Sequence, residues 1–144
     1  MRRSKTELYL HMVWATENRY PFLTDETERR MHRFLQDLAQ QRKCVVLALN
    51  GIPDHVHLLL SIHATHSAAG LAKDFKGLSS TFANQHLNFP YHFNWQENYG
   101  AFTMSRSHIP RVVKYIQRQK EHHATGDVWD EWEETFLELE DVPD

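Results

Sequence analysis

The order of apolar and polar positions divides the chain into alternating strand and helix segments. Residues 7–16 (ELYLHMVWAT) are rich in apolar and aromatic side chains and indicate a strand. Residues 43–50 (KCVVLALN) and 55–62 (HVHLLLSI) indicate two more strands, and the glycine, proline and aspartate within 51–54 indicate a turn between them. A fourth strand or strand pair, interrupted near its glycine, is predicted in residues 92–105.

Three other segments repeat apolar residues at helical spacing. The first begins after a cap at Thr24 or Asp25. Its apolar stripe is Met31, Phe34, Leu35 and Leu38. The second begins after Ser67 and runs to about position 84, with the stripe Leu71, Phe75, Leu78 and Phe82. The third is predicted as one helix over 109–123, after a cap at Ser107.

The order of these elements predicts an α+β fold of the ferredoxin-like or RRM-like type. Strand, helix, strand, strand, helix and strand form a βαββαβ sandwich, followed by an additional C-terminal helix. Two helices would cover one face of the sheet, and the other face would be open to a partner and to the last helix. The length suits a single domain, predicted over 1–126, with a tail over 127–144.

Charge is distributed unevenly between these two parts. The tail carries nine acidic and no basic residues, whereas the remainder carries 16 basic and 10 acidic residues and all 11 histidines. A mildly basic body is compatible with nucleic-acid binding. The single cysteine, Cys44, excludes an internal disulfide and a cysteine-based zinc site. No membrane-length apolar run or signal-peptide pattern is present, so we expect a cytoplasmic protein without membrane association.

The third predicted strand opens with two histidines one residue apart. Because side chains alternate along a strand, one face is wholly apolar, with Val56, Leu58, Leu60 and Ile62. His55 and His57 project together from the other face, followed there by Leu59 and Ser61. Two adjacent imidazoles can bind one metal ion, such as zinc, copper, nickel, iron or, with added oxygen ligands, manganese. A pair of ordinary surface histidines is the alternative.

The last predicted helix carries a tyrosine among polar and cationic side chains. Arg111, Tyr115, Gln119 and His122 follow one another by one helical turn and share a face. A phenolate can attack phosphorus when cations or a metal neutralise the phosphate. The alternative is a tyrosine that packs at a boundary between helix and sheet.

Together, the two segments resemble single-tyrosine HUH transposases of insertion sequences and their REP-associated relatives. The similarity lies in "NGIPDHVHLLLSI", in "WQENYGAFTMSRSHIPRVVKYIQRQKEHH" and in the opening "LHMVWATENRYPFLT". It covers roughly residues 6–123, and the combination is far more specific than either motif alone.

This resemblance implies a DNA transposase that cleaves and rejoins single-stranded DNA, often at hairpins near element ends. His55 and His57 would bind Mg²⁺ or Mn²⁺, and Gln119 would complete the ligand set. Tyr115 would attack the scissile phosphate, form a 5′-phosphotyrosine link and release a 3′-OH. The resemblance also implies a homodimer in a prokaryotic cytoplasm, associated with the nucleoid when active, whose active sites can be shared between chains.

Further residues are candidates for DNA contacts. The basic side chains that could bind phosphates are Arg2, Arg3, Lys5, Lys73, Lys76, Arg106, Arg111, Lys114 and Arg118. Each of them alone is more often an ordinary solvated surface charge. Trp95 or Tyr99 could stack on an unpaired base, with burial in the core as the alternative.

Three other functions compete with a mobile transposase. A domesticated relative would process chromosomal repeat hairpins with the same residues. A non-catalytic RRM-like module would bind nucleic acid through aromatic residues on the open sheet face. A relaxase or rolling-circle initiator fits less well, because such chains are usually larger and often carry a third metal-binding histidine.

Overall fold

The computed structural model describes residues 4–125. The predicted acidic tail and the candidate DNA contacts Arg2 and Arg3 therefore lie outside the described residues. The strands are β1 (Tyr9–Ala15), β2 (Val45–Ile52), β3 (His55–Ser61) and β4 (Gly100–Met104). The helices are α1 (Asp25–Gln41), α2 (Ala68–His86), α3 (Ile109–Gln117) and α4 (Gln119–Thr125). Two short 3-10 turns are η1 (Glu17–Arg19) and η2 (Arg106–His108).

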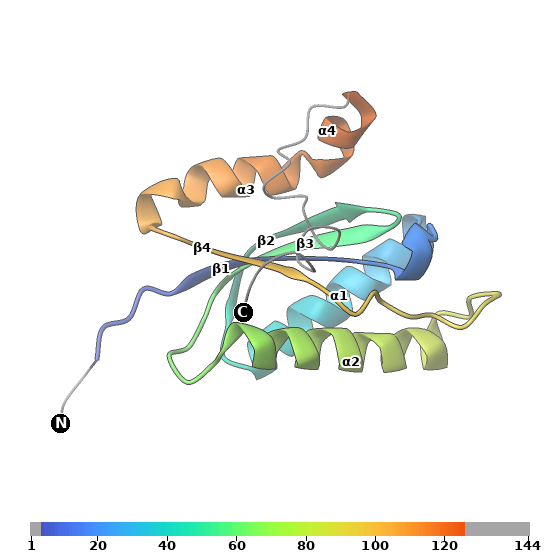
Figure 1. Ribbon diagram of the computed structural model, residues 1–144, viewed down its shortest axis with the longest axis horizontal. Helices are drawn as coiled ribbons and strands as arrows, with labels where there is room; N and C mark the ends of the chain where they lie inside the picture. The colour runs from blue at the N-terminus through green and yellow to red at the C-terminus, as the bar shows by residue number, and fades with distance from the viewer. Residues whose placement is uncertain (1–3, 126–144) are drawn as a thin grey trace.

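The four strands form one antiparallel sheet in the order β2-β3-β1-β4. Helices α1 and α2 lie on one side of this sheet, and α3 and α4 lie on the other (Figure 1). This arrangement confirms the predicted α+β sandwich with an additional C-terminal helical segment. Within the described residues, no helix is both long and apolar enough to span a membrane.

Each face of the sheet has its own apolar cluster. The larger cluster joins alternate residues of the strands, such as Trp14 and Leu58, to Leu35 of α1 and Phe75 of α2. The smaller cluster lies beneath α3 and consists of the buried residues Ala48, Leu59, Val112, Tyr115 and Ile116. Helix α3 therefore covers the sheet face that was predicted to be open to a partner and to the last helix.

The helix starts follow from local side-chain chemistry. Thr24 and Thr27 form a capping box at the start of α1, and the Ser67 hydroxyl accepts a hydrogen bond from the backbone of Gly70 at the start of α2. The predicted stripe of α2 is wrong at Leu78, which is 42% exposed, because the buried face continues through Ser79 instead.

Two boundaries also differ from the prediction. Gly51 belongs to β2, so the turn before β3 is a two-residue hairpin loop of Pro53 and Asp54. The predicted single C-terminal helix is divided at Arg118, whose backbone (φ −104°, ψ 21°) leaves the α-helical region. The Arg118 amide approaches the carbonyl oxygens of both Lys114 (3.2 Å) and Tyr115 (3.3 Å), a shared bond typical of a helix end.

Candidate active site

The histidine pair lies in a central strand, on the face covered by α3. Its intervening residue, Val56, packs into the larger core on the opposite face, as the strand alternation predicted. His55 is 1% exposed and His57 is 0% exposed. The centroids of the two imidazole rings are 5.2 Å apart. The pair is therefore a buried feature of the fold rather than two surface histidines.

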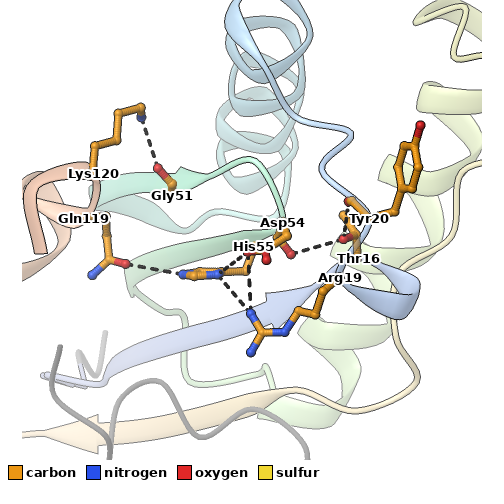
Figure 2. Close-up of polar contacts among 8 residues, drawn as sticks. All are labelled: Thr16, Arg19, Tyr20, Gly51, Asp54, His55, Gln119 and Lys120. Atoms are coloured by element: carbon orange, nitrogen blue, oxygen red, sulfur yellow. Dashed lines mark hydrogen bonds and ion pairs between the residues drawn. The ribbon is translucent and has the colours of Figure 1, made fainter. Parts of the chain in front are cut away.

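His55 is held between a carboxylate and an amide (Figure 2). Its Nδ1 lies 2.9 Å from Asp54 Oδ1, and its Nε2 lies 3.4 Å from Gln119 Oε1. Arg19 Nη1 lies 3.3 Å from the same Nδ1 and 3.5 Å from Asp54 Oδ1. An arginine only donates and a carboxylate only accepts, so one Nδ1 cannot satisfy both. The shorter contact assigns the Nδ1 proton to the bond with Asp54, and Arg19 then pairs with that carboxylate.

This assignment agrees with the charge state of Asp54. Partial burial of Asp54 opposes ionisation, but the hydrogen bond from His55 and the positive charge of Arg19 help to lower the pKa of the carboxyl below its usual value. With Nδ1 protonated, the Nε2 lone pair of His55 faces the lone pairs of Gln119 Oε1. Two electron-pair donors that face each other in a buried site suit a cation between them.

His57 has a different supporting partner, His11. His11 Nε2 lies 2.8 Å from His57 Nδ1, and both side chains are fully buried. The β1–β3 register places Val13 directly opposite His57, so His11 is two residues along on the same face. If His57 donates its Nδ1 proton to His11, its Nε2 also offers a lone pair. Each histidine of the pair therefore has an outer partner that fixes its orientation, as metal-binding histidines commonly do.

Tyr115 and Gln119 reach this site from the two short C-terminal helices. Tyr115 is 2% exposed and packs with Val112 and Ile116, so it lies on the buried face of α3. Its ring centroid is 6.0 Å from that of His57. Gln119 is fully buried, and its amide nitrogen lies 3.5 Å from the carbonyl oxygen of Tyr115. The side chain of His122 lies outside the described residues.

Lys120, near the start of α4, contacts both the sheet and α1. Lys120 Nζ lies 2.8 Å from Asn50 Oδ1, 3.1 Å from the Gly51 carbonyl oxygen and 2.9 Å from Glu28 Oε1. These contacts join α4 to both β2 and α1. Since Gln119 is the preceding residue, these contacts anchor the backbone that carries the Gln119 side chain.

The donor set is two imidazoles and one amide oxygen. Among residues 4–125, no group of three or more His, Cys, Asp or Glu side chains could hold a metal ion. A metal at the histidine pair would therefore need the oxygen of Gln119, as the resemblance implied. The buried, converging donors fit a divalent ion.

Family comparison agrees with this geometry. Residues 4–119 match the family model described as "Transposase IS200 like". The chain belongs to this family of IS200-like transposases. It is 28% identical over 120 residues to ISDra2 transposase TnpA of Deinococcus radiodurans, an alignment that covers 78% of this chain and 84% of that protein.

Two solved structures share the IS200-like fold. The crystal structure of a candidate transposase from Deinococcus radiodurans R1 is 31% identical, with a TM-score of 0.64, and the match covers 83% of this chain and 98% of that one. The structure of a REP-associated tyrosine transposase bound to a REP hairpin is 16% identical, with a TM-score of 0.62, and covers 89% and 74% of the two chains. At that identity, the second match supports the fold alone.

The predicted DNA contacts of this IS200-like transposase do not form one surface. Lys73 and Lys76 belong to α2, on the side of the sheet away from α3 (Figure 1). The Lys76 ammonium lies 2.7 Å from the Glu97 carbonyl oxygen and is partly buried, which lowers its pKa. Lys5 and Arg106 both approach Glu7, at 3.7 Å and 3.3 Å. Exposed bases on the α3 side of the sheet are Arg111, Lys114 and Arg118.

Of the two alternatives given for Trp95, burial in the core is the one observed. That side chain is 8% exposed, and its indole nitrogen donates to the Ser79 hydroxyl at 2.8 Å, so it belongs to the core. Sequence reasoning also missed Arg19, His11 and Lys120, and treated Asp54 only as a turn residue. The signal for Asp54 was its position next to His55, and the signal for His11 was the alternation of β1, which places it opposite the core.

Proposed function

We propose that the protein cleaves and rejoins single-stranded DNA through a covalent bond to Tyr115, with hairpin-bearing element ends as substrate. The observation that carries this proposal is the convergence of Tyr115, Gln119 and the His55–His57 pair on one buried face. A purely structural tyrosine would not require a polar cluster with outer carboxylate and histidine partners. A non-catalytic RRM-like module would give that cluster no role.

The residues divide the reaction between them. His55, His57 and Gln119 would hold the ion, as Mg²⁺ or Mn²⁺, and the nitrogen donors make manganese well suited in vitro. When bound, a divalent ion polarises the scissile phosphate and stabilises the charge that develops on it. Asp54 and His11 orient the two imidazoles, and Lys120 positions the amide.

Tyr115 supplies the nucleophile. Its phenol oxygen loses a proton to solvent and forms a bond to phosphorus, while the bond from phosphorus to the 3′ oxygen breaks. The departing 3′ oxygen takes up a proton and becomes a 3′-OH. A 3′-OH can later attack the same link, release the phenol and rejoin DNA, so the phosphodiester energy is retained in the covalent intermediate.

The experiment is incubation with single-stranded oligonucleotides from the flanks of the gene and Mn²⁺. We expect a DNA–protein adduct that survives denaturation, disappears with Tyr115→Phe and is retained by the matched control Tyr9→Phe. An adduct in Tyr115→Phe would assign the nucleophile elsewhere. Normal cleavage by His55→Ala with EDTA present would remove the metal from the mechanism.

We further propose that each chain completes its own site, because Tyr115 lies beside the histidine pair of the same chain. The homodimer remains a prediction, and mixing two inactive variants tests the arrangement. Tyr115→Phe mixed with His57→Ala should stay inactive if sites form within one chain. Recovered cleavage in the mixture would show that sites are shared between chains.

A domesticated endonuclease would use the same site chemistry. Genome context separates it from a mobile transposase. A single copy beside chromosomal repeats favours the domesticated enzyme, and multiple copies with matching flanking ends favour the mobile element.

A further inference from the structure

A small aromatic pocket includes Tyr20, the residue after Arg19, and Arg19 contacts His55. Its cavity of about 200 Å³ is lined by three aromatic residues, Tyr20, Phe22 and Tyr91. The polar residues Glu17, Asn18, His92 and Asn94 complete the lining. We call it the Tyr20–Tyr91 pocket. It joins the turn after β1 to the loop between α2 and β4, two segments far apart in the sequence.

Tyr20 and Tyr91 are large aromatic side chains that remain exposed to solvent instead of packing in the core. Tyr20 is 41% exposed and Tyr91 is 63% exposed. Their ring centroids are 5.5 Å apart with an interplanar angle of 82°. Phe22 supports Tyr20 from behind at 4.6 Å and itself contacts Phe93 of the core at 5.0 Å. The pocket thus presents two exposed aromatic rings, and residues packed against the core support them.

Backbone hydrogen bonds hold both walls in place. The Thr16 hydroxyl donates to the Tyr20 carbonyl oxygen at 2.7 Å, and the Tyr20 amide lies 3.2 Å from the Glu17 carbonyl oxygen. The Glu17 amide donates to the Asn94 carbonyl oxygen at 2.9 Å, which ties one wall to the other. A pre-formed site of this kind orders little on binding and loses little conformational entropy.

The same turn links the pocket to the active site. Asn18 and Arg19 have positive φ angles of 56° and 55°, which reverse the chain direction sharply. Figure 2 shows Arg19 turned toward His55 and the ring of Tyr20 turned away from it. Because consecutive Cα atoms are about 3.8 Å apart, the pocket begins one residue from the arginine that contacts the active-site histidine.

We propose that the Tyr20–Tyr91 pocket holds one unpaired base of the single-stranded DNA, adjacent to the phosphate at the active site. This rests on the proposed function. Aromatic rings stack on any base, and the Asn18 and Asn94 amides can bond to a base edge. Glu17 also lines the pocket and repels phosphate, so the base and not the backbone is the occupant.

Binding without cleavage tests the pocket separately from the chemistry. Fluorescence anisotropy in EDTA would compare a thymidine oligonucleotide of about twelve nucleotides, within the site sizes of single-strand binders, with an abasic oligonucleotide of equal length. Tyr20→Ala and Tyr91→Ala should each weaken thymidine binding about 5- to 100-fold and leave abasic binding within about twofold. Tyr91→Phe should retain affinity, because the ring remains.

Leu78→Ala is the matched control, since Leu78 is 42% exposed on α2. Equal losses for both oligonucleotides, or no loss for either, would overturn the proposal. Photocrosslinking with 5-bromouracil should map to Tyr20 or Tyr91. A crosslink found only in the groove of Phe34 and Phe82 between α1 and α2 would overturn it too. Because this assay measures binding in EDTA and involves no cleavage, failure of this pocket and failure of the proposed cleavage are distinguishable.

Discussion

His11 offers a direct test of how the histidine pair is held. His11→Leu removes the buried partner 2.8 Å from His57 Nδ1 and leaves that nitrogen without its hydrogen bond to this side chain. Such a loss in a buried site costs about 1–3 kcal/mol of folding free energy. Outer partners of metal-binding histidines typically contribute about 10- to 100-fold in affinity, equivalent to about 1.4–2.7 kcal/mol.

The perturbation should therefore appear in two measurements. Urea unfolding should show that the free energy of unfolding falls by about 1–3 kcal/mol. Titration with Mn²⁺, in which electron paramagnetic resonance measures the free ion, should show a dissociation constant raised about 10- to 100-fold. His11→Gln should recover much of the affinity, because its amide oxygen can accept from His57 Nδ1.

His32→Leu provides the control. His32 is a half-buried histidine, and its Nε2 has no hydrogen-bond partner among the described residues. Its replacement should leave Mn²⁺ affinity unchanged. If His11→Leu binds Mn²⁺ within about twofold of the parent while folded, or if His32→Leu weakens binding equally, the role assigned to His11 is refuted.

The remaining predictions concern anchoring, pH and backbone space. Lys120→Ala should lower Mn²⁺ affinity about tenfold by releasing Gln119, and unchanged affinity would contradict that link. Burial lowers the pKa of His32 from 6.5 to about 4, so the unfolded chain binds its proton first. Stability should fall as pH drops from 6.5 toward 4, by at most about 3 kcal/mol, and unfolding of His32→Gln should lack this component. Gly51→Ala would press its Cβ against the backbone of β3 and cost about 3 kcal/mol, whereas Gly77→Ala, with open space in α2, should gain up to about 1 kcal/mol by thermal unfolding.

Local pattern was sufficient for most of the fold. The alternation around Val56 separated the core face of β3 from the histidine face, and the Thr24 and Ser67 caps were identified because they depend on neighbouring residues. The α2 stripe failed at Leu78, since a regular spacing cannot tell which of two adjacent helix faces the sheet will cover. The break at Arg118 was missed because its sequence contains no glycine or proline.

The candidate site was only half visible in the sequence. His55, His57 and Tyr115 carry a motif, and the structure places them together. The residues that support them are not part of any sequence motif. Arg19 reaches His55 through a left-handed turn, and Lys120 reaches β2 and α1 only when α4 has docked, so both depend on tertiary geometry that no local pattern encodes.

The candidate site lies between two apolar clusters of different size, so the two sides of the site can unfold at different free energies. Among the described residues, twenty buried side chains form the larger cluster, and only five form the smaller one beneath α3. Segments with few buried contacts open at a lower free energy than the whole domain. A melting curve will therefore report the larger core, while the fraction of molecules with Tyr115 in place is set by the docking of α3 and α4. Hydrogen exchange of the α3 amides, rather than the melting temperature, is the appropriate measure of an intact site.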